Sequence, residues 1–390
     1  MKLFVRIPLA WLQLTRNKLR LIVALCGIAF AAILIFMQLA FLGSLYESQT
    51  AFPRRINADL VMISRKFRTL SKAPIRFPRQ YLYRALNFEG VAAVNSIYYQ
   101  RMFLKYAGAQ GSKGIFVIGI NPENSPLKLP EFEQVAHWLK IPMFALMDAN
   151  SDLKEYGAIL EELKQGQPVP VELQDQRVWI AAAIDFVGAS FADDGNLITS
   201  TTTYGKLLGA VSEEDISIGL ITLNPGVDQQ MMLQELRQQL PDNLQVVTVA
   251  DFLKLEEDYW RTGAPIGFIF TMGVLVGFLV GVIVVYQILY SEVSDHLSDY
   301  ALLKVRGYKQ RYFLKVLFQE SLLLAVLGYI PGFAVSLGLY KYTQAATALP
   351  MNMTIPRAGF VLLLTIIMCF LSGMISIRKL QEADPADLFS

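Results

Sequence analysis

The chain has 390 residues, of which 54% are hydrophobic and 17% are charged, and its formal net charge is +2. Soluble domains carry about 25% charged residues, so this composition points to a membrane protein. A net charge this small gives no indication of an acidic partner, and we predict no binding to nucleic acid. The two cysteines, Cys26 and Cys369, fall in apolar runs, which excludes a disulfide framework from the rest of the chain.

Four apolar runs divide the chain unevenly. A bilayer core needs about 20 apolar residues per helix, and the first run is too long for a signal peptide and lacks a clean cleavage site. We therefore interpret it as an uncleaved anchor. The sequence predicts an α-helical membrane protein with four transmembrane helices and a large α/β domain between the first and second. The predicted helices lie at 21–43, 265–290, 316–340 and 358–377.

Residues 1–20 precede the first predicted span, and apolar residues alternate with sparse polar ones over 3–15. This pattern fits an interfacial helix on the cytoplasmic membrane surface, or a plain N-terminal extension of the span.

The domain inserted after the first span, residues 44–262, has the composition of a mixed α/β fold. Strands are predicted at 55–64, 114–120, 216–223 and 244–249, with a helix at 227–240. The last strand–helix–strand unit resembles half of a ferredoxin-like sheet. Residues 126–214 have a different sequence pattern from the flanking pieces of the domain. They include a predicted helix near 151–165 and a predicted strand at 177–183. We interpret them as an insertion that forms an outer subdomain, with the flanking pieces forming a membrane-proximal one.

This domain shows no catalytic or metal-binding pattern. His137 stands alone beside Trp138, the acidic turn at 193–195 lacks the other ligands of a calcium loop, and residues 256–258 are predicted to be a solvated helix face. No P-loop motif occurs in the sequence. We therefore expect no metal or cofactor in this chain and no enzymatic activity of its own.

Glycines recur at helical spacing inside the second and third spans, which favours close helix packing over the alternative that glycine is simply common in membrane helices. The span centres carry no ionisable side chain, and ion-coupled transporters place such groups there. Glu320 lies about one turn inside the third span. The candidate packing residues are Gly273, Gly277, Gly281, Gly328 and Gly332.

The loop after the second span, residues 291–314, has the clearest local motif. It begins with acidic residues, continues with two leucines and ends in basic residues before a glycine. This order is typical of a short amphipathic helix whose charges match its dipole. Its candidate partner-coupling residues are Glu292, Asp295, Asp299, Leu302, Leu303, Lys304, Arg306 and Gly307.

The distribution of basic residues predicts the orientation, because short loops rich in Lys and Arg stay in the cytoplasm. The N-terminal segment, the 291–314 loop and the 378–390 tail are basic, whereas the 341–357 connection holds only Lys341 and Arg357. With four spans, all three basic segments face the cytoplasm together. We expect a multi-pass protein of the bacterial inner membrane with cytoplasmic termini and a periplasmic domain.

The order of these motifs resembles that of FtsX/MacB-like ABC transporter permeases. The sequence A-L-L-K-V-R-G-Y at 301–308, followed by an aromatic-rich entry into a span with Gln319-Glu320, is similar to the coupling segment of that family. The ending D-P-A-D-L-F at 384–389 is similar to its closing signature. The stretch P-L-A-W-L-Q-L at 8–14 and the strand at 59–61 resemble the DevC-type subfamily.

The resemblance implies a homodimer that works with two cytoplasmic ABC ATPase subunits, which bind ATP and magnesium. It also implies a periplasmic adaptor, or membrane fusion protein, and an outer-membrane TolC-like channel. In such exporters the spans transmit motion from ATP hydrolysis to the periplasmic domain, and DevC-type systems are linked with glycolipid or other hydrophobic cargo. Two alternatives share the layout: an FtsX-like regulator of a cell-wall hydrolase, and a lipoprotein-releasing permease. A membrane enzyme is a further alternative, but no residue set supports it.

Overall fold

The computed structural model describes residues 18–106, 111–209, 214–295 and 310–382. The chain divides into two compact units. One, the membrane unit, consists of Met1–Gly43, Ile266–Thr343 and Met351–Ser390; the other, the outer unit, consists of Ser44–Pro265 and Gln344–Pro350.

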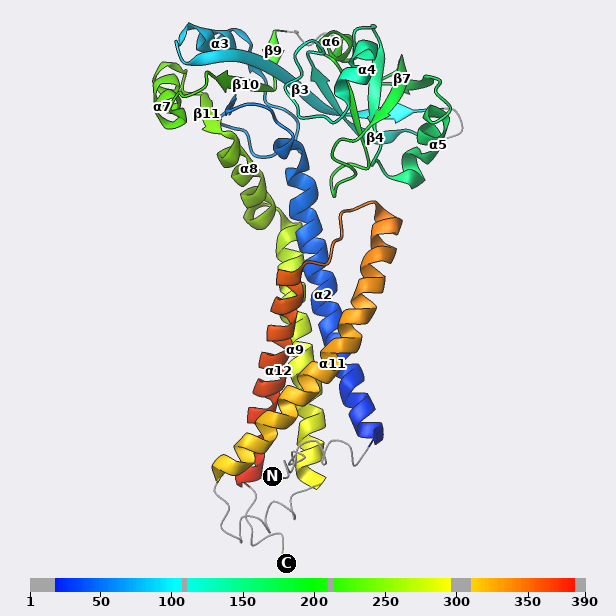
Figure 1. Cartoon of the computed structure of the whole chain (residues 1–390), viewed down its shortest axis with the longest axis vertical. Helices are drawn as coiled ribbons and strands as arrows, with labels where there is room; N and C mark the ends of the chain where they lie inside the picture. The colour runs from blue at the N-terminus through cyan, green and yellow to red at the C-terminus, as the bar shows by residue number, and fades with distance from the viewer. Residues whose placement is uncertain (1–17, 107–110, 210–213, 296–309, 383–390) are drawn as a thin grey trace, which may run out of the picture. The chain divides into compact units, whose positions relative to one another are not determined.

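The membrane unit is built from long apolar helices, which Figure 1 labels. Four helices in the described part of the chain are long and apolar enough to cross a membrane, which confirms the predicted architecture. α2 has 37 residues, and at about 1.5 Å per residue it exceeds a hydrocarbon core of about 30 Å. The helices are α2 (Lys18–Arg54), α9 (Pro265–Asp295), α11 (Gln310–Thr347) and α12 (Ile355–Glu382).

All four helices contribute to a buried apolar cluster of the membrane unit. Ile28 of α2 is fully buried there, together with Leu289 of α9, Leu324 of α11 and Met368 of α12. Because lipid surrounds the other faces, apolar side chains are exposed on them in this single chain, such as Phe268.

The outer unit contains one nine-stranded sheet with the order β11-β1-β10-β3-β4-β8-β5-β7-β6, and a small sheet of two strands, β2 and β9. Figure 1 labels several of these elements. The bounds of the strands are β1 (Leu60–Ser64), β2 (Phe77–Pro78), β3 (Val91–Lys105), β4 (Lys113–Ile120), β5 (Phe144–Asp148), β6 (Val169–Leu173), β7 (Gln176–Ile184), β8 (Asn196–Ser200), β9 (Asp215–Ile216), β10 (Ile218–Leu223) and β11 (Leu244–Thr248).

Short helices connect these strands. Four of them begin at a residue whose side chain accepts a hydrogen bond from a backbone N–H of the first turn, which satisfies a donor that the helix cannot pair itself. These caps are Asp152, Ser200, Asp228 and Thr248. The helices are α3 (Gln80–Tyr83), η1 (Arg84–Asn87), α4 (Phe132–Leu139), α5 (Leu153–Leu163), α6 (Thr201–Leu208), α7 (Gln229–Gln239) and α8 (Val249–Asp258).

The strands β11-β1-β10-β3 form a ferredoxin-like unit. β1 is antiparallel to both β10 and β11, and β10 is antiparallel to β3. Helices α3 and η1 join β1 to β3, and α7 joins β10 to β11. This is the split β-α-β arrangement, so the predicted strand–helix–strand unit is confirmed. The strand expected at 55–64 begins only at Leu60, because α2 continues to Arg54 and Ile56 makes an isolated bridge with Leu127.

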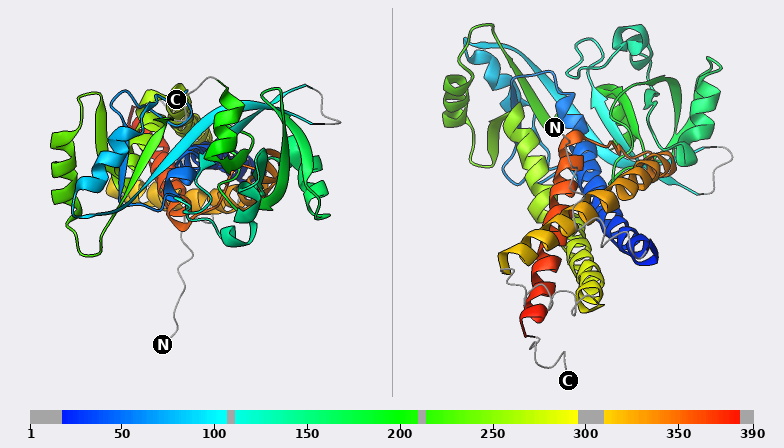
Figure 2. Two further views of the ribbon diagram at one scale, coloured as in Figure 1. Left: turned by 90° about the horizontal axis from the view of Figure 1, so that it is seen from above. Right: turned by 60° about the horizontal axis from the view of Figure 1, so that its bottom comes forward.

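The 15-residue strand β3 joins the two halves of the sheet. Up to Ile97 it pairs with β10, and from Tyr98 onward it pairs with β4. Figure 2 shows this strand crossing the outer unit. Strands β5 to β8, which come from the predicted insertion at 126–214, continue the same sheet through a parallel β4–β8 pairing and an antiparallel β3–β6 pairing. The sheet is therefore continuous across the expected boundary, and the division into two subdomains stays a prediction.

The chain passes from α8 to the second span through a short π-helix, η2 (Tyr259–Gly263), and one extended residue. Ala264 has φ −104° and ψ 131°, and α9 then begins at Pro265. Proline is well suited to this position because the first residues of a helix have no partner for their N–H groups.

The loop after β7 is held by one buried carboxylate. Asp148, at the end of β5, is 1% exposed. It accepts hydrogen bonds from the backbone N–H groups of Val187 at 3.0 Å and Gly188 at 2.7 Å, and from Asn196 Nδ2 at 2.9 Å. The backbone N–H groups of Asn150 and Phe186 also donate to it, so five donors share this one carboxylate.

We expect Asp148→Ala to destabilise the outer unit, because the backbone N–H groups of Val187 and Gly188 lose their acceptor. Hydrogen bonds to a charged group are worth about 1.5–3 kcal/mol each, and several are lost together. Thermal unfolding of the purified protein measures the effect as a lower midpoint. Asp242→Ala, at an exposed position, is the matched control and should leave the midpoint unchanged. Equal midpoints for the two variants would contradict this role for Asp148.

Candidate functional site

The predicted coupling segment lies mostly outside the described residues. Glu292 and Asp295 fall in the last turns of α9, so the helix of the second span continues into the start of the predicted loop. The other members lie outside the described ranges, and the coupling role of the whole set stays a prediction. They are Asp299, Leu302, Leu303, Lys304, Arg306 and Gly307.

The three glycines of α9 lie against α2. A Cβ atom built on Gly277 would stand 3.2 Å from Ile35 Cγ1, and one on Gly273 would collide with the Gln38 amide. Gly281 lies where a Cβ would meet Ala31 at 2.8 Å and would also collide with Met368 of α12. Absence of a side chain at these positions therefore permits the close approach of α9 to α2.

The two glycines of α11 also lie against α2. A Cβ on Gly328 would stand 2.6 Å from Ile28 Cγ2. A Cβ on Gly332 would stand 3.0 Å from the carbonyl oxygen of Ala29, so at this point the two helices approach backbone to backbone. The structure thus brings all five predicted glycines to contacts within the membrane unit, with α2 as their shared partner.

Hydrogen bonds from side chains to backbone carbonyls connect the same helices. Tyr340 of α11 donates through its hydroxyl to the Phe36 carbonyl of α2 at 2.6 Å. Tyr329 of α11 donates to the Ala358 carbonyl of α12 at 3.0 Å. Ser372 of α12 donates to Val282 of α9 at 2.8 Å. In an apolar surrounding, each such bond satisfies a hydroxyl that would otherwise be costly to bury.

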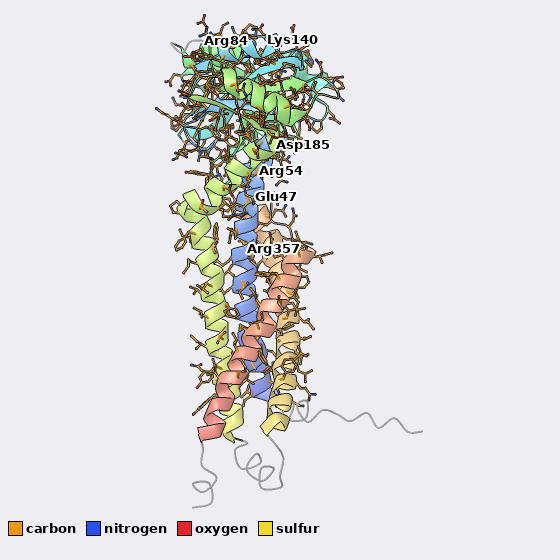
Figure 3. All side chains as sticks on the ribbon, turned by 90° about the vertical axis from the view of Figure 1, so that its left-hand side faces the viewer. Glu47, Arg54, Arg84, Lys140, Asp185 and Arg357 are labelled. Atoms are coloured by element: carbon orange, nitrogen blue, oxygen red, sulfur yellow. The ribbon has the colours of Figure 1, made fainter. Side chains whose placement is uncertain are left out.

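Arg357, labelled in Figure 3, lies near the start of α12 and contacts two other segments of the membrane unit. Its Nη1 donates to the Asn352 carbonyl at 2.8 Å, and its guanidinium lies 5.8 Å from the ring centroid of Tyr340. A Cβ on Gly43 of α2 would collide with the guanidinium. This arginine therefore fills a space that the glycine leaves open, and from the start of α12 it contacts both α2 and α11.

The outer unit shows no arrangement of catalytic groups in the described residues. His137 stacks beside Trp138 with 5.0 Å between ring centroids. Asp193, in the predicted acidic turn, pairs with Arg101 at 2.5 Å. Within the described ranges, no group of three or more His, Cys, Asp or Glu residues is placed to hold a metal. The expectations that this chain has no metal, no cofactor and no enzymatic activity stay predictions.

One acidic residue differs from its prediction. Glu256, expected on a solvated helix face, is fully buried. Its carboxylate accepts a hydrogen bond from the Leu70 N–H at 2.6 Å and one from the Thr69 hydroxyl at 2.9 Å. Burial raises the pKa of Glu256 to about 7, and these hydrogen bonds oppose the rise. The signal was present in the sequence: Glu256 follows Phe252 by four residues, so both lie on one face of α8.

Comparison with known protein families finds a match for the C-terminal part of the chain. Residues 268–385 match the family model described as FtsX-like permease C-terminal. No curated protein matches the chain at a significant level.

Three solved structures are similar to the outer part of the chain at low identity. The periplasmic region of MacB from Actinobacillus actinomycetemcomitans is 9% identical, covers 52% of this chain and 94% of its own, with a TM-score of 0.37. The extracellular domain of the noncanonic ABC-type transporter YknZ from Gram-positive bacteria is 12% identical, with 49% and 100% covered and a TM-score of 0.33. A domain of a putative permease protein from Porphyromonas gingivalis is 11% identical, with 50% and 90% covered and a TM-score of 0.30.

We expect Gly332→Leu to destabilise the membrane unit, because any side chain there meets the backbone of Ala29. Overpacking of this kind costs about 1–3 kcal/mol. Gly338→Leu is the matched control on the same helix, since a Cβ at Gly338 meets nothing within 4 Å. Thermal unfolding in detergent should show a lower midpoint for Gly332→Leu alone. If both variants unfold with the wild type, the close contact between α11 and α2 is not a stability determinant.

Glu256→Gln should change how stability depends on pH. The pKa of Glu256 is raised in the folded protein from 4.5 to about 7. The stability it contributes is therefore fully present below about pH 4.5, and is lost as the pH rises through 7. Glutamine stays neutral, so the free energy of unfolding of the variant should rise relative to that of the wild type between pH 5 and 8, by up to about 3 kcal/mol.

The measurement for Glu256→Gln is the unfolding midpoint across that pH range. Glu257→Gln, which removes an exposed carboxylate paired with Arg261, is the control and should show no such trend. A difference between Glu256→Gln and wild type that is the same at every pH would contradict the raised pKa.

Proposed function

This chain carries an FtsX-like permease C-terminal domain, and from that premise we propose that it is the membrane subunit of an ABC-type exporter. In this proposal it carries motion from a cytoplasmic ATPase to its outer unit, rather than conducting a solute through its own spans.

The observation that carries this proposal is the continuity of α2. The helix has 37 residues without a break and crosses from the membrane unit, which ends at Gly43, into the outer unit, which begins at Ser44. A second connection runs through α8, η2 and α9. In this proposal a displacement of the membrane unit reaches the outer unit along the continuous helix α2, while the second route includes Ala264, which lies outside any helix.

The nature of the spans supports motion as their task. Their centres carry no ionisable residue in the sequence, whereas ion or proton pathways need such groups. Their glycines allow α9 and α11 to lie close against α2. Helices that meet through small residues and backbone have few interlocking side chains between them, which suits a sliding or rotating contact.

The proposed partners follow from the family. A separate ABC ATPase binds ATP and magnesium and engages the 291–314 loop, since this sequence has no P-loop. A homodimer of this chain would work with a periplasmic adaptor and a TolC-like channel, in the inner membrane with both termini in the cytoplasm. The proposed cargo is lipid-like, such as a glycolipid, as in DevC-type systems.

Purification with bound partners tests this assignment against the two alternatives. An exporter should co-purify with an ATPase and an adaptor. Recovery of a cell-wall hydrolase without an adaptor would identify an FtsX-like regulator instead. Transfer of cargo to a soluble lipoprotein carrier would identify a lipoprotein-releasing permease. The extent of the outer unit, Ser44–Pro265, favours the exporter over a hydrolase regulator, which is expected to have a smaller domain.

Leu303→Asp and Gly307→Pro should each uncouple ATP hydrolysis from export, because they disrupt the apolar surface and the end of the predicted coupling helix. The reconstituted complex would keep its ATPase activity, but cargo export would fall at least tenfold. Leu153→Asp, at an exposed position of α5, adds the same charge elsewhere and serves as the control. Normal coupling in both loop variants would remove this loop from the mechanism.

A further inference from the structure

The outer unit contains a cavity that the proposed function does not use. Its volume is about 330 Å³, which is near the lower end of the range of small-molecule sites, about 300–1,000 Å³. The segment that follows β1, residues 70–76, forms one wall, and β3 and β4 form others. A second cavity of about 30 Å³ shares Leu70, Ser71, Phe116 and Asp193 with it, and reaches Gln49 of α2.

The charge of the larger cavity is positive. Lys72, Arg76 and Arg101 line it, and Asp193 is the acidic residue in its wall. That aspartate is engaged by Arg101 at 2.5 Å. In the part of the chain that the structure describes, Lys72 and Arg76 make no ion pair; Lys72 lies over the Tyr259 ring at 5.4 Å.

Two side chains in the cavity walls each carry a buried donor that has no acceptor in the described residues. Arg76 donates through Nη2 to Gln100 Oε1 at 2.7 Å and to the Tyr204 hydroxyl at 3.4 Å, but its Nε is shielded from solvent and unpaired. Gln49, only 8% exposed, accepts from Ser71 Oγ at 3.1 Å, while its Nε2 is unpaired. Buried donors are nearly always paired in folded proteins, so unpaired ones mark a place for an acceptor.

We infer that these joined cavities bind a small molecule through an oxyanion, a phosphate or a carboxylate. Arg76 presents a planar fork of donors that matches such a group, and Lys72 adds a second positive charge. The smaller cavity, with Gln49, accepts a further oxygen atom of the ligand. This site stands apart from the proposed coupling mechanism, and it does not depend on the identity of the cargo.

One wall of the site belongs to α2, and another is hydrogen-bonded to α8. Gln49 lies on α2, in the stretch that Figure 3 marks by Glu47 and Arg54. The segment with Leu70 is held by Glu256 of α8 through the Leu70 N–H. A bound oxyanion therefore contacts α2 directly and α8 through one hydrogen-bonded residue. Such a ligand is placed to act as an effector of the outer unit.

Calorimetric titration of the full-length protein in detergent tests the inference. The probes are glycerol 3-phosphate for a phosphate, glycerate for a carboxylate and glycerol as the uncharged match, all at constant ionic strength. We expect saturable binding of at least one anion and none of glycerol. Preference for one anion tells which oxyanion the site takes.

Variants localise the binding. Lys72→Gln and Arg76→Gln should each weaken it about tenfold or more, the loss expected for one charge-assisted contact of about 1.4 kcal/mol. Arg76→Lys, which keeps the charge but removes the fork, should also weaken binding. Arg79→Gln is the control, because Arg79 lies outside the cavity walls and stacks over Tyr83.

Two results would overturn the inference. One is the absence of saturable binding of either anion at concentrations up to about 10 mM, because a dissociation constant above that value would not indicate a specific site. The other is binding that Lys72→Gln and Arg76→Gln leave at wild-type affinity. Lys72 is an exposed side chain, so its variant should fold and keeps the test decisive even if Arg76→Gln is unstable. Loss of export coupling, by contrast, leaves this binding test unaffected.

Discussion

Close approach to α2 is the constraint on which the membrane unit depends. Lipid tails are as apolar as leucine side chains, so the hydrophobic effect does not hold membrane helices together. Packing and hydrogen bonds must do so. In this chain the packing comes from glycines of α9 and α11, which let both helices lie against α2. The Tyr340 hydroxyl adds a hydrogen bond to the α2 backbone. Removal of α2 would leave these surfaces without a partner.

The order of the outer unit depends on its sheet, and above all on one long strand, β3. Residues of β1 alternate between the two apolar clusters on either side of the sheet: Leu60 and Met62 in one, Val61 and Ile63 in the other. Such alternation fixes the register of a strand that is buried on both faces. β3 changes its partner from β10 to β4 without ending. Both halves of the sheet therefore share one backbone.

Much of this architecture could be predicted from the sequence, for physical reasons. A span has to be a continuous apolar run, and such runs are visible without a structure. Gly277 and Gly332 could likewise be predicted to lie in packing faces from their spacing, but the partner helix could not, since spacing says nothing about what lies opposite. The β-α-β unit of the outer part was predictable because its turns and apolar strands are local. The pairing of β3 with β4 and β6 was not, because it joins residues far apart in the chain.

Glu256 was misjudged because its neighbours in sequence are acidic, while its neighbours in space are Thr69 and Leu70. The oxyanion cavity depends on Gln49 and Arg76, which belong to separate elements and share no motif.

The π-helix and the extended Ala264 make the two connections between the units unequal. α2 continues from one unit into the other as a single helix of 37 residues. The route through η2 contains a change of helical winding and a residue outside any helix, directly before a proline. The two connections thus differ in kind: one is a single continuous helix, and the other contains a residue outside any helix next to a change of helix type.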